Sequence, residues 1–191
     1  SNRILDGGPA DAYSVVIKRA LDIAESTGNV DEMVRLGASR DWAVKHSQMD
    51  PIVREWVIKI LKDDGNRCLG KICLMRLSYG AKLIKLIRAI RFAIEDDMNI
   101  DLSKELEGWQ DGMDMVYKSR IVTNVTKFLI TAAYVQFPQV MRALDWLTAL
   151  ATASINKQLQ ANPEAMPRLE WKLSDGAVIS YWETELIKKE V

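Results

Sequence analysis

The sequence has little of what catalytic and metal sites are usually made from. It contains one histidine, His46, and two cysteines, Cys68 and Cys73, in 191 residues. Two cysteines are too few for a disulfide framework, and the spacing between them differs from that of a zinc knuckle. His46 lies in a polar segment typical of a helix end, so we expect a surface or capping role for it. This cysteine usage favours a reducing, intracellular compartment.

Nucleotide-binding and hydrolase motifs are also missing. There is no G-x-x-x-x-G-K-[ST] loop and no G-x-G-x-x-G turn, and a single histidine cannot form the H-E-x-x-H zinc motif. Clustered carboxylates can hold magnesium, but without a phosphate loop beside them a solvated acidic face is the better interpretation. We therefore predict a protein that is not an enzyme and has no metal or cofactor. A metal-dependent enzyme is the least favoured alternative.

Long hydrophobic runs are absent as well. No segment has the roughly 18 uninterrupted apolar residues that a membrane span needs. The residues Asp6, Gly7, Gly8 and Pro9 argue against a signal peptide. We expect any membrane contact to be peripheral, at the inner face of a membrane.

Charge is present in balance but is unevenly distributed. The chain has 26 basic and 26 acidic residues, yet residues 51–94 hold 10 basic and 3 acidic ones, a net +7. Residues 95–114 hold 1 basic and 8 acidic ones, a net −7. Such asymmetry indicates an electrostatic partner, which is either external or the neighbouring segment itself.

The basic segment includes KLIKLIRAIR at residues 82–91, with a base at every third position. On a helix its bases fall on the half opposite Leu83, Leu86, Ile87, Ile90 and Ile94. This pattern predicts an anion-binding face, for acidic lipid or RNA, made of Arg67, Lys71, Lys82, Lys85, Arg88 and Arg91. The alternative is a solvated face of a core helix, neutralised by the acidic segment. Glu107, Asp111 and Asp114 would share one helix face, and we expect that face to contribute to self-association.

The apolar spacing predicts helices over most of the chain. Expected segments include 13–24, 30–37, 39–47, 51–62, 66–96, 103–121, 123–137 and 139–160, the last as a well-buried helix. Gly80 is a weak point at which 66–96 would divide into two helices. The alternation in 168–174 and 177–183 around Asp175-Gly176 predicts a short hairpin.

The predicted fold class is therefore all-α: a multi-helix bundle with a short C-terminal β-hairpin. Two helical lobes are expected, residues 1–96 and residues 97–191 with the terminal hairpin. A single domain is the alternative.

A mostly helical chain with KLIKLIRAIR in its middle and apolar helices at 123–160 resembles the matrix proteins of enveloped negative-strand RNA viruses, in particular the orthomyxovirus type. The resemblance is one of architecture. It implies a layer beneath a membrane, in a virion, that self-associates and binds acidic lipid and ribonucleoprotein. The neutral total charge departs from the strongly basic members of that family, which weakens the implied nucleic-acid binding.

These observations favour a structural assembly protein that binds an anionic membrane surface through its basic helix face and associates with its own copies. The alternatives are an RNA-binding, nucleocapsid-like protein that uses the same bases, and a helical adaptor that binds another protein.

Overall fold

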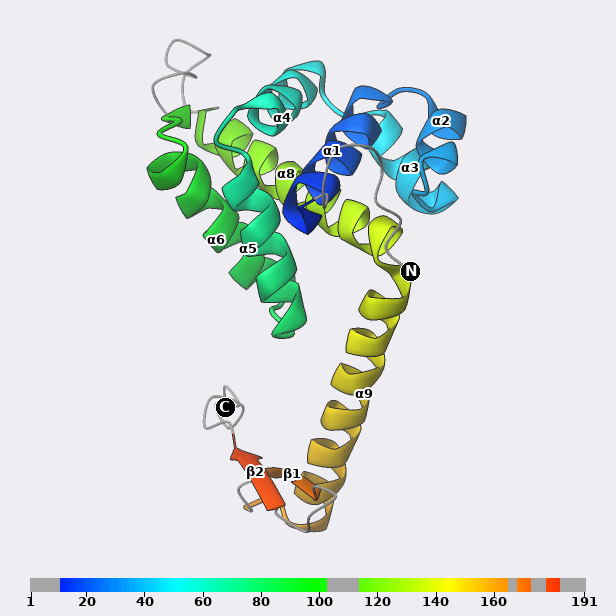
Figure 1. The fold of residues 1–191 in the computed structure, drawn as a ribbon, viewed down its shortest axis with the longest axis vertical. Helices are drawn as coiled ribbons and strands as arrows, with labels where there is room; N and C mark the ends of the chain where they lie inside the picture. Colours follow the sequence, from blue (N-terminus) through cyan, green and yellow to red (C-terminus); the bar gives the residue numbers. More distant parts are fainter. Residues whose placement is uncertain (1–10, 103–113, 165–167, 173–177, 183–191) are drawn as a thin grey trace. The chain divides into compact units, whose positions relative to one another are not determined.

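A computed structural model describes residues 11–102, 114–164, 168–172 and 178–182. The chain forms two compact units, residues 1–141 and 142–191. The first unit holds α1 (Ala12–Glu25), α2 (Val30–Arg35), α3 (Arg40–Ser47), α4 (Pro51–Lys62), α5 (Arg67–Ser78), α6 (Leu83–Phe92), the π-helix η1 (Ala93–Asp97) and α8 (Asp114–Gln136). Helix α9 (Pro138–Ala161) begins in the first unit and continues into the second. The helices confirm the all-α prediction (Figure 1).

Short polar side chains fix where the first helices begin. Asp11, Asn29, Ser39 and Asp50 each accept a hydrogen bond from a backbone N–H in the first turn of the helix that follows. These N–H groups have no partner inside a helix, so such caps stabilise the start of the helix. Asp50 precedes Pro51, whose fixed φ suits the first helical position.

Helix α8 forms the centre of the first unit. It packs against α1 and α4 and also contacts α5 and α6. Its buried side chains recur at helical spacing and include Ile121, Val125, Phe128, Leu129 and Ala132. The sequence prediction of a helix at 123–137 is therefore confirmed, although this segment is rich in β-branched residues. Burial of a continuous apolar face outweighs their weak helix propensity.

The division of the chain differs from the boundary at residues 96 and 97 that the sequence predicted. Because α8 packs on helices from the predicted first lobe, residues 114–136 belong to the same unit as residues 11–97. Helix α8 also accounts for this difference in physical terms, since α1, α4 and α5 need its apolar face to complete their core.

Residues 66–96 form two helices, α5 and α6, joined by a tight turn. Gly80 has a φ of 69°, a left-handed conformation that glycine adopts without strain. The N–H of Ala81 donates to Arg76 O and the N–H of Gly80 to Leu77 O, both at 2.9 Å, which is a Schellman ending for α5. Figure 1 shows the two helices side by side, with their turn at the end away from α4.

Close contact with α1 sets the position of α5. Gly70 is buried in α5, and a Cβ atom placed there would lie 2.5 Å from the carbonyl oxygen of Tyr13. Only a residue without a side chain allows the two backbones to approach this closely. Glycine at this one position therefore allows α5, with the bases on it, to pack closely against the core.

The second unit contains most of α9 and two paired strands. β1 (Arg168–Lys172) and β2 (Val178–Trp182) run antiparallel, with Arg168 opposite Trp182 and Lys172 opposite Val178. The predicted Asp175-Gly176 turn between them lies outside the described residues.

The expectation of a buried helix at 139–160 was wrong. The helix forms, but Met141 is its only buried residue, and large apolar side chains such as Trp146, which is 63% exposed, face solvent. Apolar content shows that a helix has a face to cover; it does not show that the same chain covers it.

A helix that crosses a bilayer would need a longer and more apolar stretch than any found among the described residues.

Candidate anion-binding surface

The six bases singled out in the sequence lie on one helical hairpin. Arg67 and Lys71 are on α5, Lys82 immediately precedes α6, and Lys85, Arg88 and Arg91 follow along α6. All six are exposed, and together they form what we call the basic face. Arg76 of α5 is exposed too.

Two members of the basic face are paired with carboxylates. Arg67 Nε lies 2.6 Å from Asp11 Oδ2, and its guanidinium group lies over the Tyr13 ring at 5.2 Å. Arg91 Nε donates to Glu95 Oε1 at 3.2 Å, one helical turn away. These two ion pairs are exposed on the arginine side, so each contributes little to stability.

The pairing leaves several bases available to a ligand. Lys85 has an interaction partner of its own. In the part of the chain that the structure describes, no carboxylate forms an ion pair with Lys71, Arg76, Lys82 or Arg88. The sequence has no acidic residue between Asp64 and Glu95, which explains the shortage of local partners. Among the ion pairs of the described residues, the acidic segment 95–114 reaches the face at Arg91, through Glu95.

Glu95 joins the basic face to the core. Its Oε1 lies 2.5 Å from Lys118 Nζ on α8 as well as 3.2 Å from Arg91. Burial raises the pKa of the Glu95 carboxyl, but the hydrogen bonds and positive charges of Lys118 and Arg91 outweigh it and leave the pKa below its ordinary value. Glu95 is therefore a structural ion-pair partner.

Stability does not account for the position of the bases at the start of α6. Lys82 stands at the N-cap without a side-chain hydrogen bond to the helix, and the first turn has no acidic residue. A positive charge at a helix N-terminus is unfavourable by about 0.3 to 1 kcal/mol. The arrangement costs folding free energy, which favours a role in binding.

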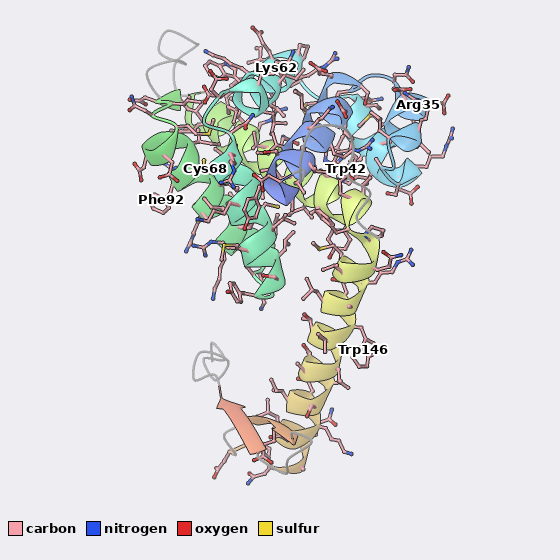
Figure 2. All side chains as sticks on the ribbon, in the orientation of Figure 1. Arg35, Trp42, Lys62, Cys68, Phe92 and Trp146 are labelled. Carbon is pink, nitrogen blue, oxygen red and sulfur yellow. The ribbon has the colours of Figure 1, made fainter. Side chains whose placement is uncertain are left out.

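Apolar residues on the outer face of the hairpin were not among the residues predicted for the site. Ile84 is 67% exposed and Phe92 is 64% exposed, and Figure 2 shows Phe92 pointing outward from α6. Leu83, which was assigned to the buried arc, is also exposed. The signal was available, because Ile84 lies about 160° around the helix from the buried Leu86 when each residue turns 100°.

The predicted acidic face lies mostly outside the described residues. Glu107 and Asp111 belong to the segment 103–113, and Asp114 begins α8 with its side chain likewise outside the description. The role of these three residues stays a prediction.

His46 is placed differently from the sequence expectation of a surface or capping role. Its ring is buried, stacks on Trp42 with the ring centroids 4.0 Å apart, and donates from Nδ1 to Trp42 O at 2.8 Å. Burial lowers the pKa of His46, and the charges of Lys127 and Lys45 lower it further against the opposing hydrogen bond. The helix end is polar in sequence, but Phe128 of α8 covers it.

Enzyme-like features are sparse in what the structure describes. No group of three potential metal ligands occurs there. A hollow of about 390 Å³ lies beside Thr27, Met49, Arg54 and Ile58. The hydroxyl of Thr27 and the Nε atom of Arg54 are buried and do not face solvent. Neither cysteine is activated: burial raises the pKa of both thiols, that of Cys73 to about 12.

Comparison of the chain with protein-family models, curated proteins and solved structures gives no match.

Proposed function

We propose that this protein is a non-enzymatic assembly protein, matrix-like in role, that attaches to an anionic membrane surface through the basic face of α5 and α6. The observation that carries the proposal is a set of exposed bases on one hairpin, of which Lys71, Lys82 and Arg88 form no ion pair with a carboxylate among the described residues. Each base near an acidic bilayer contributes about 1 kcal/mol, so four to six of them suffice for recruitment that depends on salt.

Self-association is the second part of the proposal. Adjacent segments of net +7 and −7 suit contacts between the basic face of one copy and the acidic segment of the next. Head-to-tail contacts of this kind grow into open arrays when they do not close into a ring. We expect Glu107, Asp111 and Asp114 to contribute the acidic side of this contact.

Cosedimentation tests the membrane role. The full chain is mixed with acidic vesicles, neutral vesicles or single-stranded RNA across a salt series. We expect pelleting with acidic vesicles at low salt, reduced by added salt and lost when Lys82, Lys85, Arg88 and Arg91 are all changed to alanine. Circular dichroism of this variant checks that the helices are intact.

Two results would replace the proposal. Retention of RNA with no preference for acidic vesicles would support the nucleocapsid-like alternative, which uses the same bases. Binding to neither would leave a protein adaptor. Sedimentation velocity over the same salt series tests the self-association, which should weaken as salt rises.

A further inference from the structure

The end of the α5–α6 hairpin carries large apolar side chains that are exposed to solvent. Tyr79 is 80% exposed, Leu83 is 43% exposed and Met75 is 40% exposed, and Ile84 belongs to the same group. We call these four residues the hairpin tip. Folded domains usually keep side chains of this size apart or covered, and a group of them marks an interaction surface.

The backbone places these side chains near one end of the hairpin. Tyr79 caps the C-terminus of α5, Gly80 and Ala81 follow, and Lys82 is the N-cap of α6, which starts at Leu83. Met75 precedes Tyr79 by one helical turn, so the two share a face of α5. The Schellman hydrogen bonds of Gly80 and Ala81 close the turn, so the tip is presented by a hydrogen-bonded connection between the two helices.

Two bases adjoin the hairpin tip. Arg76 and Lys82 are exposed, and neither forms an ion pair with a carboxylate in the regions that the structure describes. Long basic side chains can extend their charged ends toward phosphate groups while the stems lie along apolar surface. The tip therefore combines apolar side chains, a tyrosine and a border of positive charge.

We infer that the hairpin tip inserts into the interfacial layer of an acidic bilayer, with Arg76 and Lys82 held at the lipid phosphates. This inference rests on the proposed membrane role and adds a mode of attachment to it. Amphipathic elements bury apolar side chains about 5 to 10 Å deep at the boundary between headgroups and acyl chains. Tyrosine favours that depth because its ring is apolar and its hydroxyl is polar.

Charge and side-chain type favour lipid over RNA. RNA bases stack on aromatic rings, whereas three of the four residues of the tip, Met75, Leu83 and Ile84, are aliphatic or thioether side chains. Bases alone would give attachment that salt removes, because charges in water are screened within about 8 Å at physiological ionic strength. Insertion predicts a component of binding that survives high salt.

Vesicle cosedimentation of the full chain at about 0.1 M and 0.5 M salt tests this mode of attachment. The test variant is Tyr79→Ser with Ile84→Ser. One control is Phe92→Ser, an exposed residue of the same helix, eight residues or about 12 Å from Ile84. A second is Val44→Ser, an exposed apolar residue on α3.

We expect wild-type binding to acidic vesicles to persist in part at the higher salt. The tip variant should lose at least about tenfold in partition there, because even partial burial of two large apolar side chains contributes more than a tenfold change in partition. Both controls should behave like wild type. In a Tyr79→Trp variant, brominated lipids should quench more fluorescence than in wild type, which reports insertion without removing an apolar group.

The inference fails if the tip variant partitions like wild type at both salts. It also fails if Phe92→Ser loses as much as the tip variant, which would mean that insertion extends along α6 and is not confined to the tip. In the first case the proposed function still stands when the basic-face alanine variant loses binding. If the basic-face variant binds acidic vesicles like wild type, the proposed function itself is overturned.

Discussion

Replacing Gly70 with alanine tests how the basic hairpin is held on the core. A methyl group there would lie 2.5 Å from Tyr13 O and 3.1 Å from Ile17 Cδ1, whereas ordinary contact begins at 3.4 Å. The shortfall against the backbone oxygen is 3.4 minus 2.5, or 0.9 Å. A side chain could rotate away, but a backbone carbonyl within a helix cannot. Helices α1 and α5 must therefore move apart.

Two opposing effects set the size of the change. Alanine is a better helix former than glycine by about 1 kcal/mol, which stabilises the variant. Overpacking a close contact costs about 1 to 3 kcal/mol, occasionally more, and this contact is near the severe end because the clash is with backbone. We expect Gly70→Ala to lower the free energy of unfolding by about 1 to 2 kcal/mol. For a protein of this size the melting temperature would fall by roughly 2 to 8 °C.

Urea denaturation followed by circular dichroism measures the change. Lys71, the exposed neighbour of Gly70 in α5, supplies the calibration. The difference in stability between Lys71→Ala and Lys71→Gly gives the intrinsic preference for alanine at this point of the helix. If Gly70→Ala is more stable than wild type by that same difference, the close approach of α1 and α5 does not exist.

Three further predictions concern titratable groups. Burial lowers the pKa of His46 below 6.5, so the unfolded chain takes up a proton first as pH falls, and the free energy of unfolding should decrease from about pH 7 to pH 5. His46→Phe keeps an aromatic ring against Trp42 and should show a smaller decrease in urea titrations. A decrease equal to that of wild type would contradict the lowered pKa of His46. Raised thiol pKa values predict that native Cys68 and Cys73 react slowly with a thiol reagent near pH 7 and that both react fast in denaturant; two fast thiols in the native protein would contradict the raised pKa values. Glu95→Gln should destabilise the protein, because it removes the charge partner of Lys118, which is largely buried. The same change removes one negative charge and should strengthen binding to acidic vesicles by up to about fivefold. Weaker binding would show that Glu95 is needed to shape the basic face.

The sequence contained enough information to predict the helices and the exposure of the bases. Apolar spacing located α1, α4 and α8, and the capping residues Asp11 and Asp50 fall where α1 and α4 begin. Gly80 was recognised as a weak point, and its left-handed conformation ends α5 there. These features are local, so a single segment of sequence carries them.

The remaining features depend on tertiary contacts. His46 is buried because Phe128, far away in sequence, packs over it. Lys118 of α8 reaches Glu95, a pairing that no spacing rule indicates. The exposure of Trp146 was unexpected for the same reason, since whether an apolar residue is covered depends on which helices reach it.

The central claim, that the basic face attaches the protein to an anionic surface, is tested most directly with two pairs of charge deletions. Lys82→Ala with Arg88→Ala removes two bases of the face, and Lys18→Ala with Lys45→Ala removes two exposed bases of α1 and α3. Partition of each full-length variant onto vesicles of increasing acidic-lipid content is measured at fixed salt. At about 1 kcal/mol per base, the first pair should weaken binding by about thirtyfold and the second by less than about threefold. Equal losses for the two pairs, or no loss for the first, would contradict the claim.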